Sequence, residues 1–470
     1  MQHAFKVVLM AWHWRILSGL AFAAACAGAH AEIALDPGRV SEVVQKQLES
    51  LDVPAASIAV VADGHIVFAR AYGTDPVTAR PVTADMRFPI GSISKQFCAA
   101  AILLLQEDGK LSLDDPAGRY VANLGPATDV TLRQLLSHTG GLRDYWPQDY
   151  VFPRMKQPIT RQELVSTWAA KPLDFPPGTD RQYSNTGYVV AGMVVEKVSG
   201  ESLAHFLRHR IFEALHMDSV RDVDAEGLAD NDVRAVQRAA LGPLRPADLI
   251  GRGWLFGAAE FSMTAADLAR WDQAMVEERV LSPASWREMH TAMRFQSGWS
   301  AQYGLGVGVV TDDLGRRVIS HSGGALGFTS RNRVFPESRS AIVVLTNSDA
   351  ADAAASIADE LTPLLFDALE PLDASRREEA RQVLERLRKG EIDPGRFTPN
   401  ALAWFSPQTL RDFAASLTAL GPLRSIKLGS RQTRGGMDYR EYSVEFDVRK
   451  LTLMTRSLPD GRLEQFMLGL

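Results

Sequence analysis

Residues 92–105 have the sequence SISKQFCAAAILLL, which is the stretch of the 470-residue chain most informative about its fold and function. Ser92 is followed three positions later by Lys95, and positions i and i+3 share one face of a helix, so the amine can reach the serine oxygen. The apolar run that follows predicts a buried helix, and burial disfavours the charged form of a lysine. The stretch therefore predicts a serine nucleophile beside a base, although Ser-x-x-Lys alone is a weak motif with many coincidental matches.

Two further elements follow in the chain. Tyr183 and Asn185 lie in a proline- and glycine-rich loop, residues 175–188, that leads into an apolar helix expected from Val189. Catalytic groups are often presented on such loops. The residues HSGG at 321–324 follow a short strand-like run, 317–320, and predict a glycine-rich turn where a backbone can approach a substrate closely.

This set of motifs resembles the serine β-lactamase and penicillin-binding-protein superfamily, in its class C-like branch, which carries Ser-x-x-Lys, Tyr-x-Asn and, in many members, His-x-Gly. The segments LLSHTGGL (135–142), FSMTAADLA (261–269) and HSGGALGF (321–328) resemble further runs of that branch, so the likeness covers roughly residues 33–369. It implies an α+β fold, a β-lactamase/transpeptidase-like antiparallel sheet flanked by helices, with an inserted helical subdomain.

The resemblance also implies roles. Ser92 becomes the acylated nucleophile, and Lys95 with Tyr183 forms the proton-transfer pair, in which the sequence does not decide which residue is the base. A tyrosine titrates near ~10, so a basic Tyr183 needs positive charge nearby. The oxyanion hole is expected from the backbone N–H groups of Ser92 and Gly324. If the motifs were coincidental, Ser92 would be an ordinary helix serine and Tyr183 a loop aromatic that caps a core.

Asn185, His321 and Gly323 are predicted to bind substrate. A side-chain amide offers a donor and an acceptor, so Asn185 can orient Lys95 and bind a substrate carbonyl, or it can simply hold the turn. His321 stands where other members have a lysine, and a histidine is neutral much of the time near pH 7. Carboxylate binding is then not guaranteed, which argues against an efficient β-lactamase. Alternatively, His321 ends a strand and bonds to backbone.

These residues predict an exported serine hydrolase that forms an acyl-enzyme at Ser92 with small esters or amides, of the esterase or D-amino-acid peptidase type. One alternative is a penicillin-binding D,D-carboxypeptidase or weak class C-like β-lactamase. Another is a catalytically silent protein that binds a muropeptide or a protein partner. His138 is interpreted as structural, and Cys98 as a small buried hydrophobe.

The composition agrees with a cofactor-free globular enzyme. The chain is 46% hydrophobic with a net charge of -5, which offers no basic stripe for nucleic acid. Its ten histidines and two cysteines form no zinc-site spacing, and no phosphate-binding Gly-x-x-x-x-Gly-Lys loop occurs, so no metal or cofactor is expected. The expected ligand is a small ester, amide or D-peptide.

The first 31 residues are predicted to be a signal peptide. Lys6 and Arg15 precede an apolar stretch, residues 16–27, and the pattern Ala29-His30-Ala31 predicts cleavage after Ala31. The stretch is shorter than the ~20 residues that a membrane span needs, so no stable span is expected after processing and the protein is expected in the periplasm or outside the cell. Lipoprotein processing at Cys26 is disfavoured by Ala23.

The sequence divides into a hydrolase domain, 32–369, and a C-terminal domain, 370–470. Strands at 55–61 and 66–72, joined by an Asp-Gly hairpin, begin a sheet to which strands at 304–311, 333–335 and 341–346 return, and a helix at 350–366 ends the domain. A linker at 370–374 precedes helices at 376–389 and 407–420 and strands at 425–432, 439–448 and 451–457. This predicts a small α+β accessory domain, whose protein partner, if any, the sequence does not identify.

Overall fold

The computed structural model describes residues 35–146, 152–295, 297–325 and 327–469. The predicted signal peptide and Cys26 lie outside these residues. Among the helices that are described, none combines the length and apolar character needed to cross a membrane.

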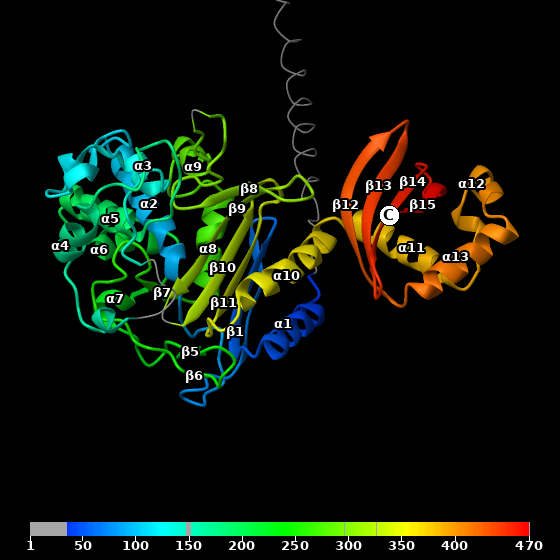
Figure 1. Cartoon of the computed structure of the whole chain (residues 1–470), viewed down its shortest axis with the longest axis horizontal. Helices are drawn as coiled ribbons and strands as arrows, with labels where there is room; N and C mark the ends of the chain where they lie inside the picture. Colours follow the sequence, from blue (N-terminus) through cyan, green and yellow to red (C-terminus); the bar gives the residue numbers. More distant parts are fainter. Residues whose placement is uncertain (1–34, 147–151, 296, 326, 470) are drawn as a thin grey trace, which may run out of the picture. The chain divides into compact units, whose positions relative to one another are not determined.

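A six-stranded antiparallel sheet is the framework of residues 35–369, with strand order β2-β1-β11-β10-β9-β8 (Figure 1). Every residue of β1 and β11 is buried, which means that both faces of the sheet are covered. Helices α1 and α10 pack together on one face, and α8 packs against β1 and β11 on the other (Figure 1). The bounds are β1 Ala55–Ala62, β2 His65–Gly73, β8 Gly308–Thr311, β9 Arg317–Ala325, β10 Phe328–Phe335, β11 Ser340–Thr346, α1 Pro37–Leu51, α8 Ala265–Val276 and α10 Ala353–Leu369.

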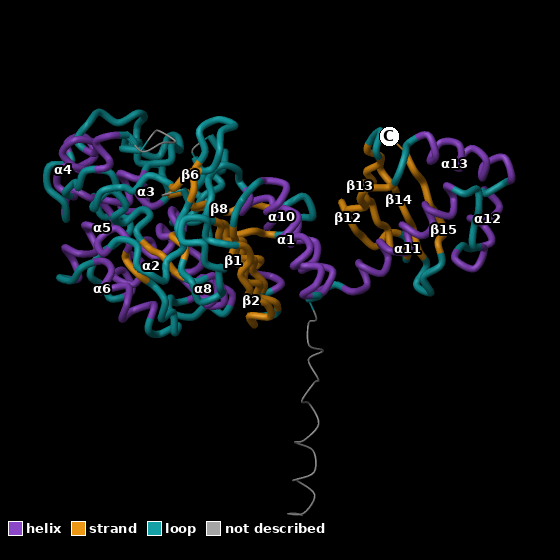
Figure 2. The backbone as a smooth tube through the Cα atoms, turned by 90° about the horizontal axis from the view of Figure 1, so that it is seen from below, coloured by secondary structure: helices purple, strands orange, loops and turns teal. Residues whose placement is uncertain are grey.

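The helical region is inserted between the early and late strands of this sheet, as the family resemblance implies. Its helices and loops surround α2, the most buried helix, in which every residue from Ser94 to Leu105 is buried. Figure 2 shows these helices and long loops gathered beside the strands of the sheet. The remaining elements are α2 Ser94–Glu107, α3 Leu132–Leu136, α4 Arg161–Leu164, α5 Asn185–Ser199, α6 Leu203–Leu207, α7 Val223–Glu226, α9 Pro283–Met289, β3 Phe88–Pro89, β4 Arg221–Asp222, β5 Val236–Gln237, β6 Arg245–Pro246 and β7 Phe261–Met263.

Residues 370–469 form three helices and a four-stranded antiparallel sheet of order β12-β13-β14-β15. Their apolar side chains make a separate cluster, drawn from Ala380 to Phe466. The elements are α11 Pro371–Arg388, α12 Pro399–Trp404, α13 Pro407–Ala419, β12 Leu423–Arg434, β13 Met437–Phe446, β14 Lys450–Ser457 and β15 Leu463–Gly469. The expected linker at 370–374 is wrong for residues 371–374, because Pro371 occupies the first helical turn, where its missing N–H costs nothing. The boundary between the two domains stays a prediction.

Three expected elements near the site differ in the structure. The HSGG segment is not a turn but the end of β9, in which His321 pairs with Asn332 of β10. The strand expected from Gly304 starts only at Gly308, because the chain turns at Gly306 (φ 73°) as it passes the backbone of Lys95. Helix α5 begins at Asn185 rather than Val189, because Ser184 caps it by accepting the Gly187 N–H.

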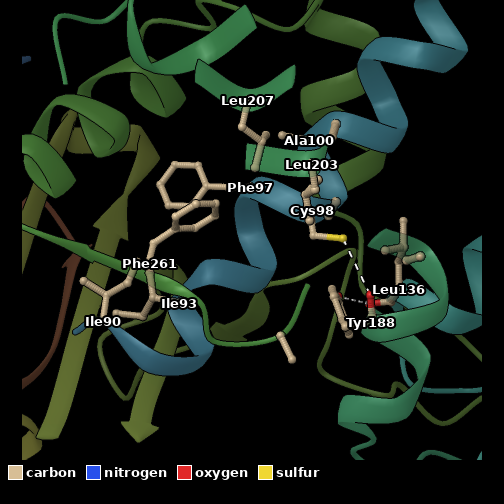
Figure 3. Close-up of a cluster of buried hydrophobic side chains, with 14 of the residues drawn as sticks. Ile90, Ile93, Phe97, Cys98, Ala100, Leu136, Tyr188, Leu203, Leu207 and Phe261 are labelled. Atoms are coloured by element: carbon tan, nitrogen blue, oxygen red, sulfur yellow. Dashed lines mark hydrogen bonds between the residues drawn. The ribbon is translucent and has the colours of Figure 1, made fainter. Parts of the chain in front are cut away.

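Phe97 anchors α2 in an aromatic cluster. Its ring centroid lies 5.2 Å from that of Phe212, 6.1 Å from that of Phe261 and 4.9 Å from that of Trp271, and Figure 3 shows Phe97 beside Phe261. We expect Phe97→Ala to lower the free energy of unfolding by about 3–5 kcal/mol, because a fully buried ring leaves a cavity. Urea denaturation of both proteins measures this loss. Phe97→Leu should lose less, and an equal loss for both variants would contradict the packing argument.

Candidate active site

Ser92 lies at the junction between a sheet edge and α2. It occupies the middle of a single 3-10 turn, Gly91–Ile93, that leads directly into α2. Gly91 has a φ of 54°, and a Cβ there would lie 2.8 Å from the backbone nitrogen of Gly324. Glycine at 91 therefore lets the turn approach β9 closely. Ser92 itself is half-buried and faces a cavity.

Lys95 is fully buried and bonded to three oxygens. Its Nζ lies 3.0 Å from Ser92 Oγ, 2.7 Å from Asn185 Oδ1 and 2.9 Å from the carbonyl oxygen of Ala258. Burial lowers the pKa of Lys95 from its usual 10.5 to about 7, and the nearby Asp144 opposes that shift. A neutral amine keeps two N–H donors, for Asn185 and Ala258, and directs its lone pair at the Ser92 hydroxyl. The geometry therefore suits a general base.

Tyr183 stands beside the same pair, on the loop before α5. Its ring centroid is 4.9 Å from Lys95 Nζ and 4.2 Å from that of His138. Burial raises the pKa of Tyr183, and contact with the Ser92 hydroxyl opposes this only in part. Tyr183 is therefore a phenol at neutral pH, suited to pass a proton on rather than to remove one. These two pKa shifts favour Lys95 over Tyr183 as the base, a choice that the sequence left open.

Asn185 uses both ends of its amide inside the protein. Its Oδ1 accepts from Lys95, and its Nδ2 donates to Asp144 at 3.0 Å from Oδ2 and 3.3 Å from Oδ1. Orientation of the lysine matches one of the roles expected for Asn185. The other, binding of a substrate carbonyl through Nδ2, would require a hydrogen bond to Asp144 to open. Asp144 was missed by sequence reasoning, although it follows the LLSHTGGL segment by two residues.

His321 is only 7% exposed, and both ring nitrogens have partners. Nδ1 lies 2.6 Å from the carbonyl oxygen of Ser322, so it carries the proton, and Nε2 accepts from the hydroxyl of Tyr303 at 2.8 Å. Burial, with the nearby Lys95, lowers the pKa of His321 to about 3. A neutral His321 supplies no cation, and contact with a substrate would require its bond to Tyr303 to open. Nothing in the sequence pointed to Tyr303.

Gly323 and Gly324 differ in their surroundings. A Cβ on Gly323 would lie 1.9 Å from the carbonyl oxygen of Ile90 and 2.3 Å from Ser330 Oγ, whereas a Cβ on Gly324 would meet nothing within 4 Å. Gly324 lines the cavity with Ser92, as expected for an oxyanion-hole pair. Gly323 lies behind it and brings β9 against the segment before Ser92.

A buried polar network holds β9 against α2 from behind. Gln96 donates to Asn332 Oδ1 at 3.1 Å and accepts from Trp271 Nε1 at 2.8 Å. Asn332 Oδ1 also accepts the backbone N–H of His321 at 3.1 Å, and its Nδ2 donates to Asp272 at 2.8 Å. These side chains fix the strand that carries Gly324 relative to the helix that carries Lys95. A glutamine directly after Lys95 in an apolar run was the one signal of this network in the sequence.

The cavity in front of Ser92 has a volume of about 820 Å³. That size suits a small molecule or a short peptide. Its walls carry charges of both signs, with Arg238 paired to Asp52 and Asp248 paired to Lys156. The lining residues are Ser92, Asp144, Tyr145, Trp146, Tyr183, Asn185, Gln237, Arg238, Ala239, Arg245, Asp248, Ala259, Gly324, Ala325, Gly327, Phe328 and Asp349.

Within the residues that the structure describes, one group of side chains away from Ser92 has the donor types of a metal site. Glu201 Oε2 lies 2.8 Å from His205 Nδ1 and 3.4 Å from His209 Nδ1, on and beside α6. Both histidines are exposed, and the glutamate already pairs with them. None of these three residues lines the Ser92 cavity, so they are not part of the candidate site at Ser92.

The fold and this arrangement of serine, buried lysine and tyrosine define a class of protein, the active-site serine proteins with a β-lactamase-like fold. A family model described as Beta-lactamase matches residues 40–364, and the chain belongs to this family.

Similar proteins include Penicillin-binding protein 4* of Bacillus subtilis (strain 168), 29% identical over 61% of this chain and 66% of that protein. A D-aminopeptidase of Brucella ovis is 28% identical over 64% of this chain and 58% of its own length. The chain thus spans less than two thirds of these relatives. Among solved structures, the octameric penicillin-binding protein homologue from Pyrococcus abyssi matches 92% of this chain and 99% of its own, at 21% identity and a TM-score of 0.61, which concerns the fold alone.

Proposed function

We propose that this chain is an exported serine hydrolase that forms an acyl-enzyme at Ser92 with small esters or with amides of the D-amino-acid peptide type. The observation that carries the proposal is the 3.0 Å contact between Lys95 Nζ and Ser92 Oγ. Burial brings the pKa of that amine to about 7, so a large fraction is neutral at physiological pH. A serine hydroxyl needs such a base to act as a nucleophile.

In the proposed acylation step, Ser92 Oγ attacks the carbonyl carbon of the substrate and its proton passes to Lys95. The backbone N–H groups of Ser92 and Gly324 stabilise the negative charge that develops on the carbonyl oxygen. Tyr183, a phenol in contact with Ser92, gives its proton to the leaving alcohol or amine and regains one from Lys95. Water then attacks the acyl-enzyme, with the same groups moving the proton in the reverse direction.

The substrate class follows from the charges near the nucleophile. His321 is neutral, so the position where a lysine would hold a substrate carboxylate provides no permanent cation. Esters and amides that do not depend on a carboxylate at that position are therefore favoured. The similarity to a D-aminopeptidase supports the D-amino-acid side of this proposal.

The second candidate is a penicillin-binding D,D-carboxypeptidase or a weak β-lactamase, which the similarity to Penicillin-binding protein 4* favours. A silent binding protein is the third candidate, and it would not require a lysine with a lowered pKa beside Ser92.

We also propose that the hydrolase domain ends at residue 369 and that a signal peptide is cleaved after Ala31. Residues 370–470 are proposed to buttress the hydrolase domain.

Intact mass spectrometry of the wild type and of Ser92→Ala, incubated with a penicillin and separately with an activated ester, tests the proposal. Ester turnover without a lasting penicillin adduct, lost in Ser92→Ala, is the expected result. A stable penicillin adduct on the wild type alone would identify a penicillin-binding peptidase instead. No adduct and no turnover with either compound would favour the binding protein.

A further inference from the structure

Asp144 contacts Asn185, the residue that bonds to Lys95, and no motif in the sequence assigned it a role. It lies on the loop after the LLSHTGGL segment, half-buried, and lines the cavity. Its carboxylate accepts from the backbone N–H of Trp146 at 3.1 Å, from the backbone N–H of Asn185 at 3.1 Å and from the Asn185 amide. Burial raises the pKa of the Asp144 carboxyl, and the N–H groups of Trp146 and Asn185, with the nearby Lys95, oppose that shift. Every one of the hydrogen-bonding groups donates to Asp144, which favours the ionised carboxylate.

The contact to the Asn185 amide fixes which end of that amide faces Lys95. An asparagine amide can rotate by half a turn, which exchanges its oxygen and nitrogen. With the nitrogen toward Lys95, two donors would face each other and the lysine would lose its 2.7 Å bond to Oδ1. An acceptor-only carboxylate on the far side of Asn185 favours the other orientation, in which Nδ2 meets Asp144 and Oδ1 meets Lys95.

We propose that Asp144 is a positioning residue for the Ser92–Lys95 pair, which it controls by holding the Asn185 amide in one orientation and by placing a negative charge behind the buried amine. This inference rests on the function proposed above. A purely local role, in which Asp144 only closes its own turn and caps α5, would leave the titration of Lys95 unchanged.

The surroundings of Lys95 make Asp144 the main source of charge there. Asp144, Cys98 and Glu260 each raise the pKa of Lys95 against burial, with Asp144 the largest of the three. Burial raises the pKa of Cys98 and of Glu260, so both tend to be neutral. Tyr183 and Tyr188 present ring faces to the amine at 4.9 and 5.4 Å. His138 and His321, whose pKa values burial lowers, are neutral as well.

The test is the pH titration of the Lys95 amine itself, followed by the ¹³Cε chemical shift of selectively labelled lysine in the full chain. The Lys95 signal is the one that disappears in Lys95→Met. In Asp144→Asn we expect the midpoint to fall by about one pH unit, because removal of an opposite charge disfavours the ammonium form. The acid limb of kcat/KM for an ester should move to lower pH by the same amount, and kcat should fall about tenfold as Asn185 loses its orientation.

Asp174→Asn is the matched control. Asp174 is exposed and accepts a hydrogen bond at 2.9 Å from Arg143, the residue directly before Asp144. This variant therefore disturbs the loop of Asp144 without changing the charge near Lys95. It should leave the Lys95 midpoint unchanged. Should Asp144→Asn not fold, Asp144→Ser supplies a neutral side chain with an acceptor oxygen for the same comparison. An unchanged or higher midpoint in the neutral variants, or an equal fall in Asp174→Asn, would overturn the inference. Because the titration needs no turnover, it gives this answer even if the proposed hydrolase activity fails.

Discussion

Lys95→Met is expected to lower kcat/KM for an activated ester on the order of 10³-fold, because a positioned base typically contributes 10²- to 10⁴-fold. Methionine fits the space of the lysine stem but has no amine to accept the Ser92 proton. Steady-state kinetics with the wild type and the variant measure the loss. An activity within tenfold of the wild type would mean that another group, Tyr183 being the nearest, acts as the base.

The same variant has a pH-dependent effect on stability that activity cannot report. Burial holds the pKa of Lys95 near 7 against a usual 10.5, so between these pH values the unfolded chain binds more protons than the folded chain. Stability of the wild type therefore rises with pH across this window, by about 1.4 kcal/mol for each unit of the pKa difference. Methionine does not titrate, so the stability of Lys95→Met relative to the wild type should be greatest at or below pH 7 and fall toward pH 10. Urea denaturation at pH 6.5 and 9.5 measures this difference, and no change between them would contradict a lowered pKa.

Much of the site was predictable because its chemistry is local in sequence. Ser92 and Lys95 are three residues apart on one helical stretch, so periodicity alone placed the amine at the hydroxyl, and the run from Phe97 to Leu105 predicted its burial. Strands β1 and β2 were also correctly expected, because short strand-like runs joined by an Asp-Gly turn are local signals. Asp63 and Gly64 indeed both have positive φ, 47° and 79°.

What the sequence did not predict depends on contacts between distant segments. Tyr303 meets His321 because the chain turns at Gly306, and this turn exists only where that segment packs on the backbone of Lys95. Asp144 acts through Asn185, 41 residues further along the chain. The HSGG segment was expected to be a turn because glycines favour turns. Its pairing with β10 and its close contact with the residues before Ser92 make it a strand instead.

Gly323→Ala is expected to reduce ester turnover by about 10²- to 10³-fold, the usual effect of losing one oxyanion-hole donor. The added Cβ would lie 1.9 Å from the carbonyl oxygen of Ile90, a backbone atom that cannot rotate away. Strand β9 must therefore move away from the turn that carries Ser92, and it would take the N–H of Gly324 with it. Kinetics with an activated ester and a urea denaturation curve for each protein measure the effect.

Gly324→Ala is the matched comparison for stability, because a Cβ at that position meets nothing within 4 Å. We expect this neighbouring variant to unfold within about 0.5 kcal/mol of the wild type, as surface substitutions usually do, and Gly323→Ala to be less stable by about 1–3 kcal/mol, as expected for a side chain forced into a packed site. Equal stabilities of the two variants would mean that β9 accommodates a Cβ at position 323 without loss of stability. In that case the closeness of β9 to Ser92 would not depend on glycine at 323, and the Gly324 N–H would have to be held in place by the Gln96–Asn332 network alone.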